Sequence, residues 1–268
     1  MGGRGAGGAA VVGVLGASGG VGTSCVAAAL ATVAARTGLR TVCADASAHG
    51  GGIDALFDLE SRPGARWPDL AAARGRLDGA ALLRHLPVSA DGVHVLAAAD
   101  QPADQPPGQP LGSEGADPGP VLTALAAAAD ALVLDLGTAG GAGPIGAVGP
   151  AGAVGPATAG SGPPCCDDLI LVVGAGVPAL ARAGRAAAIV AAGGAGRAWL
   201  VQRVPRGRAD LADLVAERLG LPLLGVVPDD PRLDDALARG VPPGAARTRL
   251  GALADRFWGV LAAQERIA

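Results

Sequence analysis

The chain has 268 residues, a formal net charge of −3, 45 glycines and 21 prolines, and 50% of its residues are hydrophobic. This length is enough to bury a sizeable core within one domain. The basic side chains are scattered arginines, with no lysine and no basic stripe, which argues against a sequence-specific nucleic-acid partner.

The chain opens on a stretch that predicts a phosphate-binding loop. Residues 10–16 are apolar and predict a strand, residues 17–24 are rich in glycine, and the alanine-rich residues 25–36 predict a helix. Glycines let successive backbone N–H groups point inward, and the start of a helix adds a partial positive charge. The usual pattern closes with Gly-Lys-Ser/Thr, whereas this chain reads Gly22-Thr23-Ser24. The stretch therefore indicates a nucleotide site that lacks its lysine.

Apolar runs and helical patterns alternate along the rest of the chain. The further predicted strands cover residues 40–45, 92–96, 131–135, 168–173, 198–203 and 223–227. The further predicted helices cover residues 78–86, 121–129, 177–192, 209–219, 231–239 and 249–264, and Asp69 is the expected N-cap of a helical region near Trp67. Residues 101–120 and 138–164 are of low complexity, and we expect poorly ordered loops there.

This alternation predicts a single α/β domain over residues 1–268, with a doubly wound, mainly parallel sheet of about seven strands and helices on both faces. In such folds the ligand lies at the carboxyl ends of the strands. The glycine-rich loop, Asp45, Asp135 and the pair Gln202-Arg203 all follow predicted strands. We therefore expect them at one edge of the sheet.

Cysteine spacing and hydropathy indicate the cellular setting. The four cysteines, Cys25, Cys43, Cys165 and Cys166, have no metal-ligand spacing and fit a reduced, cytoplasmic protein. The longest apolar run, residues 169–192, carries two arginines and is broken by glycines and a proline, so we expect no transmembrane segment. The last helix has apolar residues at helical spacing and is expected to dock on the core.

Several segments together resemble the deviant P-loop ATPases of the MinD/ParA class. Residues 45–54, 63–70 and 73–77 are similar in particular to the septum-site-determining, CpaE-like branch of actinobacteria. The resemblance runs from about residue 11 to residue 261, with the two low-complexity loops as interruptions. Members of that branch usually carry a receiver-like domain before the ATPase part, so the resemblance implies that such a domain is missing here or was lost to a shifted start.

The resemblance also assigns roles within the loop. The family's loop reads Lys-Gly-Gly-x-Gly-Lys-Thr/Ser; here Ser18 takes the first lysine position, Thr23 takes the second, and Ser24 keeps the hydroxyl that ligates Mg²⁺. The base is contacted near the ends of later strands. The implied nucleotide-binding residues are Ala17, Ser18, Gly19, Gly20, Val21, Gly22, Thr23, Ser24, Gln202, Arg203, Pro228 and Asp229.

The acidic positions of the family are only partly kept. Its Asp-x-Asp pair is matched by Asp45 and Ser47, so a serine stands where a carboxylate orients the attacking water. Asp135 resembles the metal-side acid, which makes Ser24, Asp45 and Asp135 the implied metal ligands. Phosphoryl transfer depends on positioned charge, and each lost group should cost orders of magnitude in rate. No catalytic residue of the family is therefore intact.

Three functions stay open at this point. The first is a MinD-like regulator of septum-site selection or of pilus and secretion-system positioning, with weak ATP or ADP and Mg²⁺ binding and impaired hydrolysis. The second is a slow but active ATPase of the same fold, and the third is a scaffold that binds no nucleotide. The resemblance implies protein partners in the division or pilus and secretion machinery, a homodimer, and a cytoplasmic location that partners extend to the membrane surface.

Overall fold

The computed structural model of the protein describes residues 8–47, 52–98, 118–139, 166–192, 195–207, 211–245 and 248–266. The two low-complexity loops lie almost wholly outside the described residues, so their expected disorder stays a prediction. Their described edges are regular, because a helix begins at Gly119 and a strand continues to Thr138. The loops are therefore shorter at these edges than the sequence predicts.

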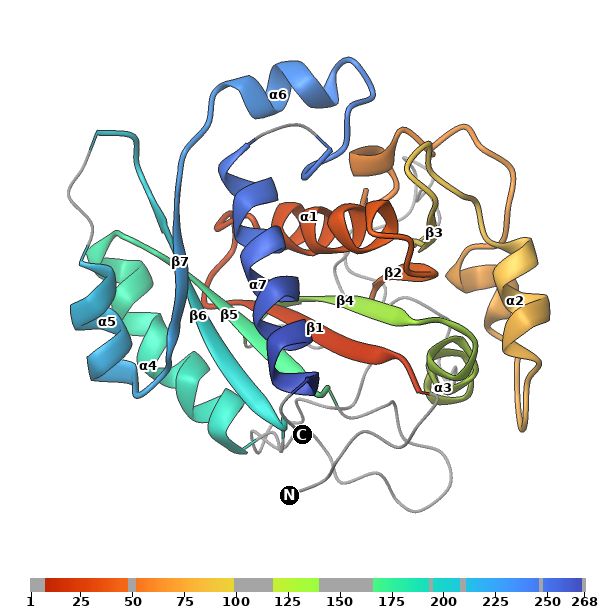
Figure 1. The fold of residues 1–268 in the computed structure, drawn as a ribbon, viewed down its shortest axis with the longest axis horizontal. Helices are drawn as coiled ribbons and strands as arrows, with labels where there is room; N and C mark the ends of the chain where they lie inside the picture. Colours follow the sequence, from red (N-terminus) through yellow and green to blue (C-terminus); the bar gives the residue numbers. More distant parts are fainter. Residues whose placement is uncertain are drawn as a thin grey trace, which may run out of the picture.

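The described strands form one sheet, in which seven parallel strands follow the order β3-β2-β4-β1-β5-β6-β7 (Figure 1). The central strand β1 is buried along its whole length. Because all strands run the same way, their carboxyl ends share one edge. This confirms the predicted doubly wound α/β fold. The strands are β1 Ala10–Gly16, β2 Thr41–Asp45, β3 Val93–Leu96, β4 Ala131–Thr138, β5 Asp168–Gly174, β6 Arg197–Val204 and β7 Leu223–Pro228.

Helices cover both faces of the sheet. One hydrophobic cluster joins α1 and α7 to one face, and two further clusters join α2 with α3, and α4 with α5, to the other face. In Figure 1, α1 and α7 lie in front of the strands. The helices are α1 Thr23–Arg36, α2 Gly79–His85, α3 Gly119–Ala128, α4 Val177–Ala192, α5 Ala212–Leu219, α6 Arg232–Leu237 and α7 Arg249–Glu265, with short 3-10 turns η1 Ala55–Phe57 and η2 Trp67–Leu70.

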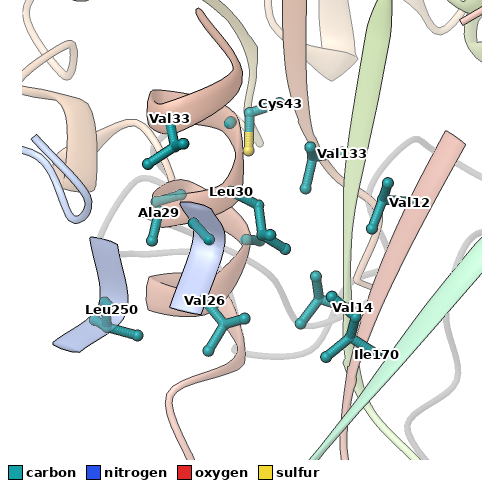
Figure 2. Packing of buried hydrophobic residues seen from close by; sticks show 14 of the residues in the cluster. Val12, Val14, Val26, Ala29, Leu30, Val33, Cys43, Val133, Ile170 and Leu250 are labelled. Atoms are coloured by element: carbon teal, nitrogen blue, oxygen red, sulfur yellow. The ribbon is translucent and has the colours of Figure 1, made fainter. Parts of the chain in front are cut away.

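Strand alternation divides the core between these faces. On β1, Val12 and Val14 join the cluster of α1 and α7, whereas Val11 and Leu15 join the clusters on the opposite face. Figure 2 shows Leu30 of α1 beside the valines of the central strands, and Leu250 of α7 near the start of α1. The continuous burial of β1 follows, because a parallel strand covered on both faces needs apolar residues at every position.

Three local features need comment. Asp69 is not the N-cap that the sequence predicts: its carboxylate accepts the backbone N–H of Arg66 at 2.8 Å from the third position of η2. His94 on β3 has its Nδ1 3.0 Å from the carbonyl oxygen of Leu83. The last helix docks on the core, as expected, and its Phe257 is fully buried. Within the described part of the chain, no helix combines the length and the apolar character needed to cross a membrane.

Candidate functional site

The turn between β1 and α1 has the backbone conformation of a phosphate-binding loop. Gly20 and Gly22 have φ angles of 74° and 87°, in the left-handed region that favours glycine. Gly22 is also the N-cap of α1, so the helix starts at Thr23, two residues earlier than predicted. A Cβ at Gly16 would lie 2.4 Å from the Thr23 hydroxyl oxygen, which shows that the threonine side chain folds back against the end of β1. Thr23 is therefore buried beneath the loop.

Two acids lie side by side at the edge of the sheet where this loop begins. Asp45 on β2 and Asp135 on β4 are register partners, and both are buried. Asp45 accepts the backbone N–H of Ser47 at 3.0 Å, and Asp135 accepts that of Gly137 at 3.0 Å. The Ser24 side chain also hydrogen-bonds Asp135, which links the acids to the first turn of α1. The sheet therefore brings the three implied metal ligands together.

The buried surroundings of Asp45 and Asp135 disfavour the ionised form of both carboxyl groups. Burial, followed by the nearby Asp135 carboxylate, raises the pKa of Asp45 to about 7, although the Ser47 N–H acts in the opposite direction. Burial also raises the pKa of Asp135, against the hydrogen bonds from Ser24 and Gly137. Neither acid has an arginine partner among the ion pairs of the described residues. Two oxygen ligands of this kind and the Ser24 hydroxyl suit Mg²⁺, which would supply the missing positive charge.

Ser47 lies across the same edge, next to the end of β4. A Cβ at Gly137 would meet the Ser47 hydroxyl oxygen at 2.5 Å, so the two residues are in direct contact. Gly137 has a φ of 69°, and the Ser47 side chain takes the space that a side chain at Gly137 would occupy. The residue at the implied water-orienting position therefore packs against Gly137, two residues after Asp135, and has a hydroxyl where a carboxylate would be.

Trp67 hydrogen-bonds the backbone of Asp45 in the acid pair, a contact that the sequence did not predict. Its indole Nε1 donates to the backbone carbonyl oxygen of Asp45 at 2.5 Å, and its backbone N–H donates to Ala97 at 3.0 Å. The neighbouring Arg66 pairs with the buried Asp54 at 3.3 Å. Trp67 thus ties the end of β2 to the segment that follows β3. A tryptophan before a proline gives no signal of such a contact, because the partner is a distant carbonyl group.

A pocket lies between the first turn of α1, the ends of β5, β6 and β7, and the start of α7. Its walls include apolar residues together with Gly22, Cys25, Arg203 and Pro228. Arg203 Nε donates to Asp229 at 2.7 Å. Cys25 is half-buried and lines this pocket.

Gln202 takes a different position from its neighbour. It is buried, and alternation along β6 points it to the face opposite Arg203, away from the pocket. Its Oε1 has no hydrogen-bond partner among the described residues. The structure thus gathers the loop, the acids, Arg203, Pro228 and Asp229 at one edge, but it does not bring Gln202 to them. Across the described part of the chain, no group of three or more His, Cys, Asp or Glu side chains could hold a metal, so the two acids would share a metal with the Ser24 hydroxyl.

The sheet order and the glycine-rich loop on its central strand define a P-loop nucleotide-binding fold. No family model matches the sequence. Two uncharacterised proteins, from two strains of Mycobacterium tuberculosis, are each 34% identical to it over 252 residues, which are 94% of this chain and 64% of each relative. The chain thus spans somewhat less than two thirds of these relatives.

Solved structures show which P-loop fold it is. The MinD cell division protein of Aquifex aeolicus has a TM-score of 0.68 at 18% identity, covering 95% of this chain and 97% of its own. A ParA family ATPase of Chlorobium tepidum has a TM-score of 0.68 at 18% identity, covering 93% and 98%. The septum site-determining protein MinD of Pyrococcus horikoshii, complexed with Mg-ADP, has a TM-score of 0.61 at 17% identity, covering 92% and 95%. The chain therefore has the fold of the MinD and ParA ATPases.

Proposed function

We propose that this chain is a MinD-like, nucleotide-binding regulator that acts through protein contacts. The observation that carries the proposal is the link from Ser24 to Asp135, which lies in register with Asp45 beside the glycine-rich loop. Backbone N–H groups of such a loop bind phosphate, and a hydroxyl with two carboxylates binds Mg²⁺. ATP or ADP with Mg²⁺ is the proposed ligand, and the Mg-ADP complex of the Pyrococcus neighbour supports this choice.

Residues 17–24 are proposed to hold the phosphates, and Ser24, Asp45 and Asp135 to hold the metal. When bound, Mg²⁺ would neutralise the acid pair and shield the phosphate charge. The base is proposed to lie toward Pro228 and Asp229, because Pro228 lines the pocket beside the loop. Gln202, which the resemblance also places near the base, would need to turn from the opposite face, so we leave it out of the proposed contacts.

Binding without efficient hydrolysis is the expected behaviour. Thr23 is too short to reach the β- and γ-phosphates from its buried position, and it carries no charge. Ser47 cannot orient water as a carboxylate does, and Ser18 cannot bridge to a partner's phosphates as a lysine does. At each of these three positions the chain lacks a charged group, a lysine or a carboxylate, that would stabilise the transition state or orient the water. We therefore propose that nucleotide occupancy, with little turnover, sets which proteins this chain contacts.

The proposed setting is septum-site selection or the positioning of a pilus or secretion system. The fold neighbours include a MinC:MinD cell division protein complex from Aquifex aeolicus, which supports a protein partner of the division or secretion machinery. A homodimer and a cytoplasmic location with partner-dependent attachment to the membrane surface belong to the same proposal.

Calorimetric titration of the purified chain with ATP and ADP, with Mg²⁺ and then with EDTA, tests the proposal. Mg²⁺-dependent binding that Ser24→Ala weakens is the expected result. Ser61→Ala is the matched control, because it removes an exposed hydroxyl far from the loop in sequence. Phosphate release by the same samples should stay near the background rate.

Three results would contradict parts of this proposal. Rapid phosphate release would favour the slow-ATPase function and overturn the impaired site. No detectable binding of either nucleotide would leave the scaffold function. Binding that EDTA does not weaken would show that the acid pair does not hold the metal.

A further inference from the structure

A positive charge lies directly against the phosphate loop, although it comes from a distant strand. A Cβ built on Gly22 would lie 2.6 Å from Nη1 of Arg203, so the guanidinium group of Arg203 contacts the Gly22 backbone. Gly22 immediately precedes Thr23, the position where P-loop proteins carry lysine. Nη1 of Arg203 thus occupies the space that a Cβ at Gly22 would take. The Arg203 guanidinium group therefore reaches the loop next to Thr23, where the loop lacks the lysine of other P-loop proteins.

The arginine is held in this position by its own ion pair. Its Nε donates to Asp229 at 2.7 Å, and the backbone N–H of Asp229 donates to the carbonyl oxygen of Val204 at 2.9 Å. The ends of β6 and β7 are therefore joined behind the guanidinium group. Asp229 occupies the Nε edge, while Nη1 lies over Gly22. With 34% of its side chain exposed, Arg203 is accessible to a ligand in the pocket.

The charge of Arg203 also acts on the first turn of α1. Burial raises the pKa of the Cys25 thiol, and the Arg203 guanidinium opposes this rise. Among the described residues that line the pocket, Arg203 and Arg249 are the arginines, and Arg249 belongs to α7 on the other side. Arg203 is therefore the cation that the described structure places on the loop itself.

We propose that Arg203 is the phosphate-binding cation of this chain, supplying from β6 the charge that Thr23 does not supply from α1. A guanidinium group can bind phosphate oxygens with two parallel hydrogen bonds, so it can serve this purpose without entering the loop. This inference rests on the proposed function, because it requires phosphates on residues 17–24. It differs from the resemblance, which places Arg203 near the base.

The test compares ligands that carry only the phosphates, only the base and ribose, or both. We would titrate the parent chain and Arg203→Gln with ATP, adenosine and inorganic tripolyphosphate, all with Mg²⁺. Arg203→Gln is expected to bind ATP and tripolyphosphate roughly ten- to a hundredfold more weakly, as for a lost charge-assisted hydrogen bond, and to bind adenosine as the parent does. Arg218→Gln is the matched control, because it removes the same charge from an exposed position on α5. It should bind all three ligands as the parent does.

A second variant asks whether the two positions supply the same charge. Thr23→Lys in the Arg203→Gln background should restore tripolyphosphate binding to the parent level or above. The same substitution in the parent should give a smaller gain, since one cation is already present. Arg203→Lys keeps a positive charge and should bind tripolyphosphate more tightly than Arg203→Gln. Thermal unfolding of each variant confirms that the chain is folded.

Each other result overturns the inference in a distinguishable way. If the parent binds neither ATP nor tripolyphosphate, the proposed function fails and the inference fails with it. If the parent binds but Arg203→Gln binds equally well, only the inference fails. Loss of adenosine binding alone would assign Arg203 to the base. Tighter binding by Arg203→Gln would show that the arginine blocks the loop.

Discussion

Asp45 and Asp135 lie in register on two adjacent parallel strands, and both carboxyl groups are buried at the edge of the sheet. Backbone N–H groups and one serine side chain are the hydrogen-bond donors described for them. Burial and their mutual repulsion oppose the charged form of both carboxyl groups unless a compensating group is present. We therefore expect the pair to hold a proton or a metal ion, which links stability, pH and Mg²⁺.

Without Mg²⁺, the free energy of unfolding should fall as pH rises from about 4 to about 7. The pKa of Asp45 is raised from 3.8 to about 7, so over this range the native state keeps a proton that the unfolded chain has lost. The slope is about 1.4 kcal/mol per pH unit at most. Asp45→Asn, which stays neutral, should remove this loss and melt higher than the parent at pH 8 in EDTA. Thermal unfolding between pH 5 and 8 measures it, with the exposed Asp213→Asn as control. An equal decline in Asp45→Asn would refute the assignment.

Mg²⁺ binding should weaken as pH falls below about 7, since a metal must displace the proton that Asp45 keeps there. We expect titration of the ADP-loaded chain with Mg²⁺ to release protons at pH 6 and to release fewer at pH 8. Calorimetry in two buffers of different ionisation enthalpy counts these protons. A proton count that does not change with pH would mean that Asp45 is not a ligand.

Repair of the loop and of the acid position should restore turnover in steps. Thr23→Lys alone should raise ATP affinity, by less than it does in the Arg203→Gln background, and without much hydrolysis, because no carboxylate orients the water. Adding Ser47→Asp should begin to restore phosphate release, because it supplies the carboxylate that the water-orienting position lacks. Adding Ser18→Lys should make turnover depend on protein concentration. The effects should be non-additive, because they act on one transition state.

The comparison that decides this prediction is the parent against the double variant Thr23→Lys/Ser47→Asp, at equal Mg²⁺ and protein concentrations. If the parent releases phosphate as fast as the double variant does, the catalytic site of the parent is not impaired.

Trp67→Phe should weaken Mg²⁺ binding as well as stability. It removes the N–H donor to the Asp45 carbonyl, at a cost of about 1–3 kcal/mol in the free energy of unfolding. Trp258→Phe is a matched control, because Trp258 Nε1 donates to the backbone carbonyl of Leu30 at 2.9 Å, away from the acids. Both variants should lose stability, and only Trp67→Phe should also lose Mg²⁺ affinity. Equal Mg²⁺ affinity in the two variants would reduce Trp67 to a packing residue.

The sequence alone determined the fold class and the composition of the site. Strand and helix periods depend on residues that are close in the chain, so all seven strands and the docking of α7 could be predicted. The glycines of the loop and the acids that follow β2 and β4 were found for the same reason. Errors fell at helix starts, as at Asp69 and Thr23, where one backbone conformation decides the boundary.

Only the tertiary structure decided which side chains meet. The pairing of Asp45 with Asp135 depends on strand register, and the separation of Gln202 from Arg203 depends on which face of β6 each one takes. The contacts of Trp67 with Asp45 and of Arg203 with Gly22 join segments that lie far apart in the chain. Such contacts follow from how the layers pack, and no local pattern in the sequence encodes them.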